Sequence, residues 1–199
     1  MEMLAAVAIG YLIGSIPTAE WIGRLWNVEL RKQGSGNPGT ANALGVGGPA
    51  LAATVLLVEM AKGAGAALLG SVFAGEQGIV AAGLAAALGN LYNVWYRFAG
   101  GKGLGITAGV LLVAWPWMLA AGLAVIGLSA WATRSSGGAT IITIVFLALA
   151  SVFWGPLGLP EGWGIESGLL PFLAIGLGLA ILPKHIEGAR FRRPAAGES

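Results

Sequence analysis

The sequence contains no cysteine and a single histidine, His185, and these two absences exclude several kinds of site. Without cysteine the chain can form no disulfide and offers no thiolate as a nucleophile or metal ligand. One histidine cannot supply a multi-histidine metal centre. We therefore expect neither a metal site nor another cofactor.

Charge is also scarce, since only 10% of the 199 residues are charged whereas 56% are hydrophobic. A soluble domain has about 25% charged residues, so this composition cannot cover a water-soluble surface. The mean hydropathy of +0.79 points to lipid as the solvent. The net charge of +2 is too small to indicate a nucleic-acid partner, and we expect none.

Apolar stretches recur along the whole chain, and a helix needs about 20 residues to cross the hydrocarbon core. They cover residues 3–23, 50–74, 78–96, 104–132, 139–154 and 168–182. The first stretch has an acidic flank and no clean small-residue cleavage site, so we interpret it as a retained span rather than a signal peptide.

The fourth stretch is ambiguous, because it is long for one span and short for two, and it contains Pro116. Cytoplasmic loops carry an excess of Lys and Arg. If residues 104–132 form a hairpin that turns at Trp115 and Pro116, ten of the eleven cations fall on one side. These are Arg24, Arg31, Lys32, Arg97, Lys102, Arg134, Lys184, Arg190, Arg192 and Arg193.

The connections on the other side then carry only Glu76, Glu161 and Glu166. The charges therefore predict an all-α polytopic membrane protein, a bundle of seven short transmembrane helices. Its N-terminus lies outside and its C-terminus lies in the cytoplasm, and residues 1–199 form a single domain.

Within the second apolar stretch, Glu59 and Lys62 are three residues apart and so lie on one face of a helix. Ionisable groups inside a membrane usually face a partner or a wet cavity. We predict that these two side chains pair with each other, and that Glu20 approaches the same interface.

Three polar motifs lie in the predicted cytoplasmic segments. Residues 34–42 read Gly-Ser-Gly-Asn-Pro-Gly-Thr-Ala-Asn. Alternating glycines with small polar side chains present backbone N–H groups around a concave path, which suits an oxyanion. The alternative is a flexible turn before the next helix.

The second motif, residues 99–103, places three glycines and Lys102 at the start of a predicted helix. Bare N–H groups, a helix dipole and one cation favour a phosphate, although Lys102 is also explained as a cytoplasmic-side residue. The third motif contains His185 and Glu187. Residues two apart point to different sides of a helix, so each would need its own partner, unless this is an ordinary charged membrane-exit segment.

Taken together, these residues resemble the acyl-phosphate:glycerol-3-phosphate acyltransferases of the PlsY type over nearly the full length. The matching stretches are Tyr11 to Pro17, Leu30-Arg31, Gly34 to Asn37, Gly39 to Asn42, Lys62-Gly63, Gly89, Tyr92, Phe98, Gly100 to Gly103, Arg134, His185 and Glu187. The resemblance implies seven spans and transfer of a fatty acyl group from acyl phosphate to the 1-hydroxyl of glycerol 3-phosphate, which forms lysophosphatidic acid for phospholipid synthesis.

The resemblance also implies the site. Catalytic roles fall on Ser35, Asn37, His185 and Glu187, and substrate binding falls on Gly34, Gly36, Gly39, Asn42, Gly100, Gly101, Lys102 and Gly103. The expected partners are the two substrates and the lipid bilayer of the bacterial inner membrane, with the protein as a monomer.

The sequence departs from this family's pattern at several positions. The family has an arginine at Gly45, a histidine at Asn90, a proline at Asn93 and a lysine at Ala99, with a serine near Gly137 and an asparagine at Gly188. An arginine is a bidentate phosphate donor that lysine does not reproduce. The alternative is therefore a non-enzymatic relative that binds or transports a phosphorylated solute or lipid.

Overall fold

The computed structural model describes residues 1–160 and 162–190, without the side chains of residues 187–190. Glu161, Arg192 and Arg193 lie outside the described residues, and so does the side chain of the predicted site residue Glu187. Regular structure in the described part of the chain is helical. The α-helices are α1 (Glu2–Ser15), α2 (Thr18–Leu25), α3 (Thr40–Leu91), α4 (Leu104–Ala114), α5 (Pro116–Thr133), α6 (Ser136–Trp154) and α7 (Leu170–Arg190). Two short 3-10 helices cover Val94–Tyr96 (η1) and Ser167–Leu169 (η2).

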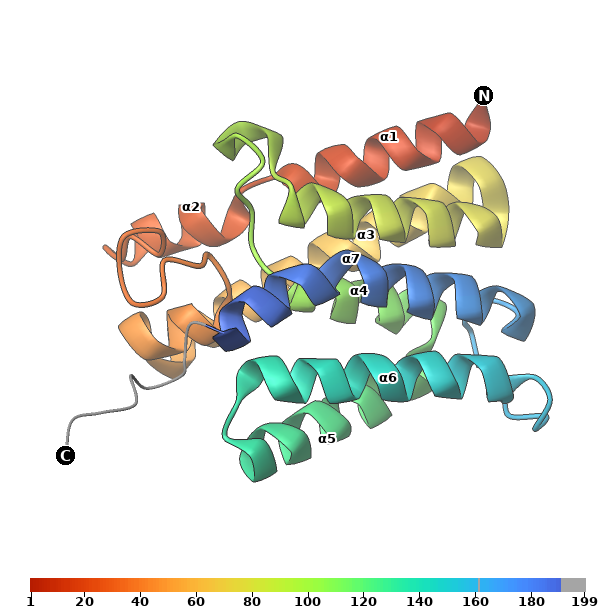
Figure 1. Cartoon of the computed structure of the whole chain (residues 1–199). Coiled ribbons are helices and arrows are strands. Elements are labelled where there is room, and N and C mark those ends of the chain that lie inside the picture. The colour runs from red at the N-terminus through yellow and green to blue at the C-terminus, as the bar shows by residue number, and fades with distance from the viewer. Residues whose placement is uncertain (161, 191–199) are drawn as a thin grey trace.

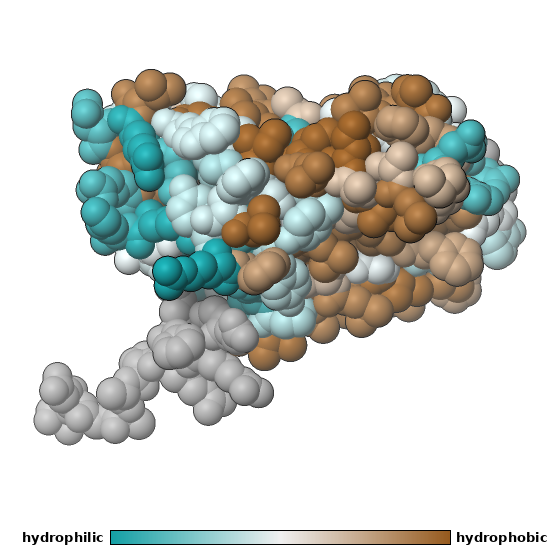
Figure 2. All heavy atoms as spheres, turned by 90° about the horizontal axis from the view of Figure 1, so that it is seen from above, coloured by the Kyte–Doolittle hydropathy of each residue, from teal (hydrophilic) through white to brown (hydrophobic). Residues whose placement is uncertain are grey.

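Five helical stretches of the described residues are long and apolar enough to cross a membrane, and α4 is a shorter apolar helix. Figure 2 shows hydrophobic side chains along the body of the molecule and hydrophilic ones gathered at its two ends, most densely at the left end of that view. This distribution agrees with the predicted all-α membrane fold.

The first apolar stretch, predicted to be a retained span, lies within the helical segment Glu2–Leu25, which is long and apolar enough to cross a membrane. It breaks between α1 and α2 at Ile16 and Pro17. Proline has no backbone N–H and its ring clashes with the preceding turn, so a helix is interrupted there. The carbonyl oxygen of Ile16 is freed from the α1 ladder by this break and accepts a hydrogen bond from Thr18 N–H at 2.9 Å.

Helix α3 contains the second predicted stretch and most of the third, and it folds back on itself (Figure 1). Its backbone leaves helical geometry at Ala74 and Gly75, where a connection was predicted. A further break at Gly48 precedes Pro49, and α3 starts at Thr40, well before the apolar stretch that was expected to begin at residue 50. The helix ends at Leu91 instead of residue 96.

The predicted break at Trp115 and Pro116 is confirmed, since α4 ends one residue before Trp115 and α5 begins one residue after it. The connection between α6 and α7 covers the end of the short α4. Ile165 N–H donates to the carbonyl of Ala114 at 2.9 Å, and Trp163 Nε1 donates to that of Leu112 at 3.1 Å. These bonds satisfy carbonyls that the end of a helix leaves without partners.

Figure 1 shows which segments share an end of the bundle. The helix α2, the loop before α3, the loop between α3 and α4, the α5–α6 turn and the end of α7 lie at one end, which we call the α2 end. The N-terminus, the turn inside α3, the α4–α5 turn and the α6–α7 connection lie at the other. All three predicted polar motifs therefore lie at the α2 end.

Small residues let the helices pack closely, as expected for helices that associate in lipid. Gly10 and Gly14 of α1 lie directly against the backbone of Ala82 and Ala86 in α3, where a β-carbon on either glycine would clash. This close contact fixes α1 beside the second half of α3 and thereby sets the position of Pro17 and α2.

Candidate active site

The loop of residues 34–39 is held by Asn42, a buried residue in the first turn of α3. Its side-chain oxygen accepts from Ser35 N–H at 2.8 Å and from Ser35 Oγ at 3.1 Å. Its side-chain nitrogen donates to the carbonyls of Leu30 at 2.8 Å and Gln33 at 3.1 Å. The amide oxygen thus binds the loop, and the amide nitrogen binds the residues that lead into it.

Ser35 stands exposed between Gly34 and Gly36, which adopt positive φ angles of 61° and 70°. Left-handed backbone is unfavourable for residues with a β-carbon, so these two glycines allow the tight path that presents Ser35. The backbone N–H of Asn37 lies 3.4 Å from Ser35 Oγ. These bonds and the two glycines define the path of the loop around Ser35.

The glycine-rich segment 99–103 packs against the end of α3. Gly100 N–H donates to the carbonyl of Leu91 at 2.9 Å, and Gly101 N–H donates to that of Asn90 at 3.0 Å. A β-carbon at Gly100 would clash with the Asn90 carbonyl oxygen. These two N–H groups are therefore engaged within the protein, and the groups suited to an anion are the first N–H groups of α4, which follows Gly103.

His185 brings the third motif to the same place. Its side chain in α7 is buried, with 2% of the residue exposed, and among the described residues neither of the two buried ring nitrogens has a well-formed hydrogen bond. The ring lies beside the backbone and the charge of Lys102. One turn earlier on α7, Ile181 lies against Gly103.

The loop of residues 34–39 also reaches the glycine-rich segment, because a β-carbon on Gly101 would lie 3.6 Å from the carbonyl oxygen of Pro38. Segments from three distant parts of the sequence thus meet at the α2 end. The predicted meeting of the three motifs is observed, apart from Glu187, whose side chain is outside the described part.

Glu59 and Lys62 form the predicted pair, with Lys62 Nζ 3.1 and 3.2 Å from the two carboxylate oxygens. Glu59 also accepts from Thr18 Oγ1 at 2.5 Å and from Asn90 Nδ2 at 2.8 Å. Lys62 donates to the Ile16 carbonyl at 2.7 Å. The pair therefore braces the break between α1 and α2.

A second polar cluster was not predicted. Arg31 Nε pairs with a carboxylate oxygen of Glu20, and the guanidinium lies 3.9 Å from the centre of the Tyr96 ring. Tyr96 donates to Glu20 at 2.5 Å, and Arg31 Nη1 donates to the carbonyl of Ala99 at 2.7 Å. Burial lowers the pKa of Arg31 while Tyr96 raises it, and an arginine remains protonated at neutral pH.

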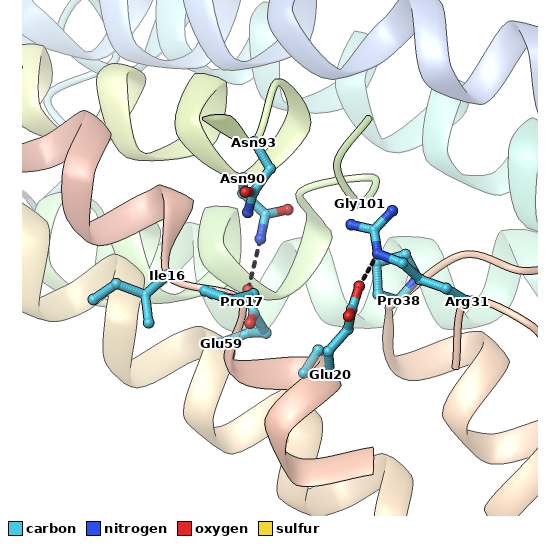
Figure 3. Close-up of a pocket in the computed structure, with 10 residues that line it drawn as sticks. Ile16, Pro17, Glu20, Arg31, Pro38, Glu59, Asn90, Asn93 and Gly101 are labelled. Carbon is cyan, nitrogen blue, oxygen red and sulfur yellow. Dashed lines mark hydrogen bonds and ion pairs between the residues drawn. The ribbon is translucent and has the colours of Figure 1, made fainter. Parts of the chain in front are cut away.

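The two clusters border one small cavity of about 20 Å³, which has room for about one water molecule. Figure 3 shows Arg31 facing Glu20 on one side of it and Asn90 facing Glu59 on the other. Pro38 and Gly101 complete the wall between the two loops. As predicted, Glu20 and Glu59 meet at one interface. What the sequence did not reveal is that Arg31 and Tyr96 join them.

The fold and this site define an all-helical integral membrane protein whose glycine-rich polar loops gather at one end. The family model described as glycerol-3-phosphate acyltransferase matches residues 4–191. A glycerol-3-phosphate acyltransferase of Symbiobacterium thermophilum is 41% identical over 150 residues, covering 74% of this chain and 75% of the relative. The one of Sinorhizobium fredii is 44% identical over 159 residues, which cover 78% of each chain.

Two solved structures share the fold. Both are crystal structures of PlsY (YgiH), an integral membrane glycerol 3-phosphate acyltransferase, one in the glycerol 3-phosphate form and one in the lysophosphatidic acid form. Each is 29% identical and covers 96% of this chain and 91% of its own, with TM-scores of 0.79 and 0.78. The chain belongs to the glycerol-3-phosphate acyltransferase family, and the prediction of an acyltransferase is confirmed over the non-enzymatic alternative.

Proposed function

We propose that this protein transfers a fatty acyl group from acyl phosphate to the 1-hydroxyl of glycerol 3-phosphate. The relatives support the acceptor, because they are named for it and a solved relative takes a glycerol 3-phosphate form. The single observation that supports a working site in this chain is the meeting of the Ser35 loop, the glycine-rich segment and His185 at the α2 end.

The proposed reaction forms a bond between the glycerol oxygen and the acyl carbon, and it breaks the bond between that carbon and the phosphate oxygen. The hydroxyl proton ends on the departing phosphate, so the products are lysophosphatidic acid and inorganic phosphate. Acyl phosphate is already activated, and holding the two reactants together therefore supplies much of the rate.

Each predicted site residue has a proposed role. Ser35 and Asn37 hydrogen-bond the reacting groups, while Asn42 and the glycines at 34, 36 and 39 hold the shape of their loop. Lys102 and the N-terminus of α4 hold a phosphate, and Gly100, Gly101 and Gly103 set where that helix starts. His185 and Glu187 complete the pocket.

We further propose that the single domain crosses the bacterial inner membrane seven times, with the α2 end in the cytoplasm. The turn inside α3 and the break between α4 and α5 supply the additional crossings. Cations in α2, the following loops, the α5–α6 turn and the end of α7 share the α2 end, which the positive-inside rule assigns to the cytoplasm. The active unit is a monomer.

The direct test uses purified protein in detergent with acyl phosphate and glycerol 3-phosphate. We expect lysophosphatidic acid and inorganic phosphate to appear in equal amounts. Protein in which Ser35 is replaced by alanine provides the control, because its loop keeps the Asn42 bond to the backbone N–H of residue 35. Release of phosphate without lysophosphatidic acid would identify a hydrolase, and no turnover with any acyl phosphate would contradict the proposal.

A further inference from the structure

In the segment that precedes α4, the peptide unit between Ala99 and Gly100 is hydrogen-bonded on both sides. Its carbonyl oxygen accepts from Arg31 Nη1 at 2.7 Å, and its N–H donates to the carbonyl of Leu91 at 2.9 Å. A peptide unit is planar and rigid, so a bond at each side fixes its orientation. The fixed orientation of this peptide in turn sets the position of the residues that follow, Gly101 to Gly103.

Arg31 has two further contacts, and its two partners are bonded to each other. Its Nε pairs with Glu20 of α2, its plane lies on the ring of Tyr96, and Tyr96 donates to the other oxygen of Glu20. Glu20 is buried at 7% exposure, whereas the Arg31 side chain is 26% exposed. A planar guanidinium can serve a carboxylate, an aromatic ring and a carbonyl at the same time, and a lysine ammonium cannot.

The three residues come from separate segments: α2, the loop of residues 26–39, and η1. The same loop continues to Ser35 and to Pro38, whose carbonyl oxygen lies beside Gly101. Arg31 thus joins the loop that presents Ser35 to the segment that begins α4. The proposed function gives no chemical step to Arg31 or to the residues that it contacts.

We propose that Glu20, Arg31 and Tyr96 are positioning residues that set the distance between the Ser35 loop and the phosphate-holding start of α4. The inference deepens the proposed acyl transfer and rests on it. The three side chains act through the Ala99–Gly100 peptide and do not touch the substrates. Their loss therefore weakens the binding of a phosphate-bearing substrate more than it slows the turnover of bound substrate.

Arg31→Gln and Arg31→Lys separate positioning from simple charge pairing. The glutamine variant loses the cation, and the lysine variant keeps a cation for Glu20 but lacks the fork that reaches Ala99 as well. We expect both variants to raise the KM for at least one of the two phosphate-bearing substrates by about tenfold, the size of one lost charge-assisted hydrogen bond, with kcat within about threefold. Arg31→Lys should regain the melting temperature of the wild type but keep the raised KM.

Tyr96→Phe is the milder variant, because it keeps the ring beneath Arg31 and removes only the hydroxyl that binds Glu20. We expect its KM to rise by about threefold to tenfold. Arg24→Gln, which removes an exposed cation from the same helix as Glu20, is the matched control and should leave KM unchanged. If Arg31→Gln does not fold, Arg31→Lys and Tyr96→Phe decide the question.

Inorganic phosphate is the probe that separates this inference from the proposed reaction. Phosphate should raise the melting temperature of the wild type and do so less in the Arg31 and Tyr96 variants, whether or not lysophosphatidic acid is formed. The inference is overturned if phosphate does not protect the wild type, if folded Arg31→Lys regains the wild-type KM, or if Tyr96→Phe matches the wild type in both assays. A fall in kcat at unchanged KM would also overturn it.

Discussion

Lys62 donates a hydrogen bond of 2.7 Å to the carbonyl oxygen of Ile16, which Pro17 leaves outside the α1 ladder. The lysine thereby gives a hydrogen bond to a carbonyl at the break between α1 and α2, and Glu59 balances its charge. Buried ion pairs persist when their hydrogen-bonding groups find partners. The break and the pair are consequently one structural unit, which connects the α2 end to the body of the bundle.

The first prediction follows from this unit. Lys62→Met should lower the stability of the protein in detergent by about 3 kcal/mol or more, because it leaves the Glu59 carboxylate buried without its partner. Thermal unfolding in detergent measures the loss. The exposed pair of Glu29 and Lys32 has the same spacing and serves as the control, so Lys32→Met should leave the melting temperature nearly unchanged. Equal effects of the two changes would show that the buried pair has no special role.

The second prediction concerns Lys102, which the sequence explained equally well as a phosphate ligand or as a cytoplasmic-side cation. Lys102→Ala should weaken binding of a phosphate-bearing substrate by about 10-fold to 150-fold, the value of one charge-assisted bond. The protein should stay folded. Steady-state kinetics with each substrate varied in turn measures the effect, with Lys32→Ala as the control. Unchanged kinetics would leave Lys102 with a topological role alone.

The third prediction tests the close packing of the glycine-rich segment. Gly100→Ala should displace this segment, because the added β-carbon meets the Asn90 carbonyl oxygen, which is backbone and cannot rotate away. We expect lower protection by inorganic phosphate in a thermal-shift assay and a higher KM. Gly65→Ala in α3, where nothing lies within 4 Å of the added carbon, is the control and should bind phosphate normally. Normal binding by Gly100→Ala would mean that the segment adapts.

In the two polar clusters, the sequence predicted the contact between residues that are close along the chain, and it did not predict those that join Arg31 to distant segments. The pair of Glu59 and Lys62 was predicted because helical spacing alone brings them together. Arg31 was interpreted as a cytoplasmic-side cation and as part of the family resemblance, and no role in the site was predicted for it. Its bonds to Glu20 and Ala99 depend on how α2 and η1 pack, and no local pattern reports that packing.

The helix boundaries also divide into those with a local signal in the sequence and those that depend on distant contacts. The turn at Ala74 and the break at Trp115 were predicted, because hydrophobicity and proline are local signals. The break at Pro17 was missed, since the apolar stretch continues through it and only the Lys62 bond to Ile16 reveals its role. The early start of α3 was missed as well, because the Asn42 bonds that order its first turn reach back to residues 30–35.

The fourth prediction concerns topology. A reporter fused after Arg193 should report the cytoplasm, and one inserted near Gly158 should report the outside, because the cations gather at the α2 end. Gly158 lies in the α6–α7 connection at the opposite end. Activity of paired cytoplasmic and external reporters in intact cells measures both positions. An external C-terminal tail would contradict the seven-span arrangement.

The last prediction concerns Gly45, where the family pattern has an arginine. The structure leaves room for one, since Gly45 is exposed in the first part of α3 and a β-carbon there meets nothing within 4 Å. Gly45→Arg should therefore fold normally and lower the KM for glycerol 3-phosphate, because a guanidinium offers the acceptor phosphate a bidentate partner that glycine lacks. Gly45→Gln adds a long polar side chain without a charge and should not lower the KM. Gly45→Lys should lower the KM less than Gly45→Arg does. Kinetics with the acceptor varied, together with melting temperatures, measures all three. If the wild type already binds glycerol 3-phosphate tightly and a stable Gly45→Arg gains nothing, another group has taken over that phosphate, and the role assigned to position 45 by resemblance is wrong.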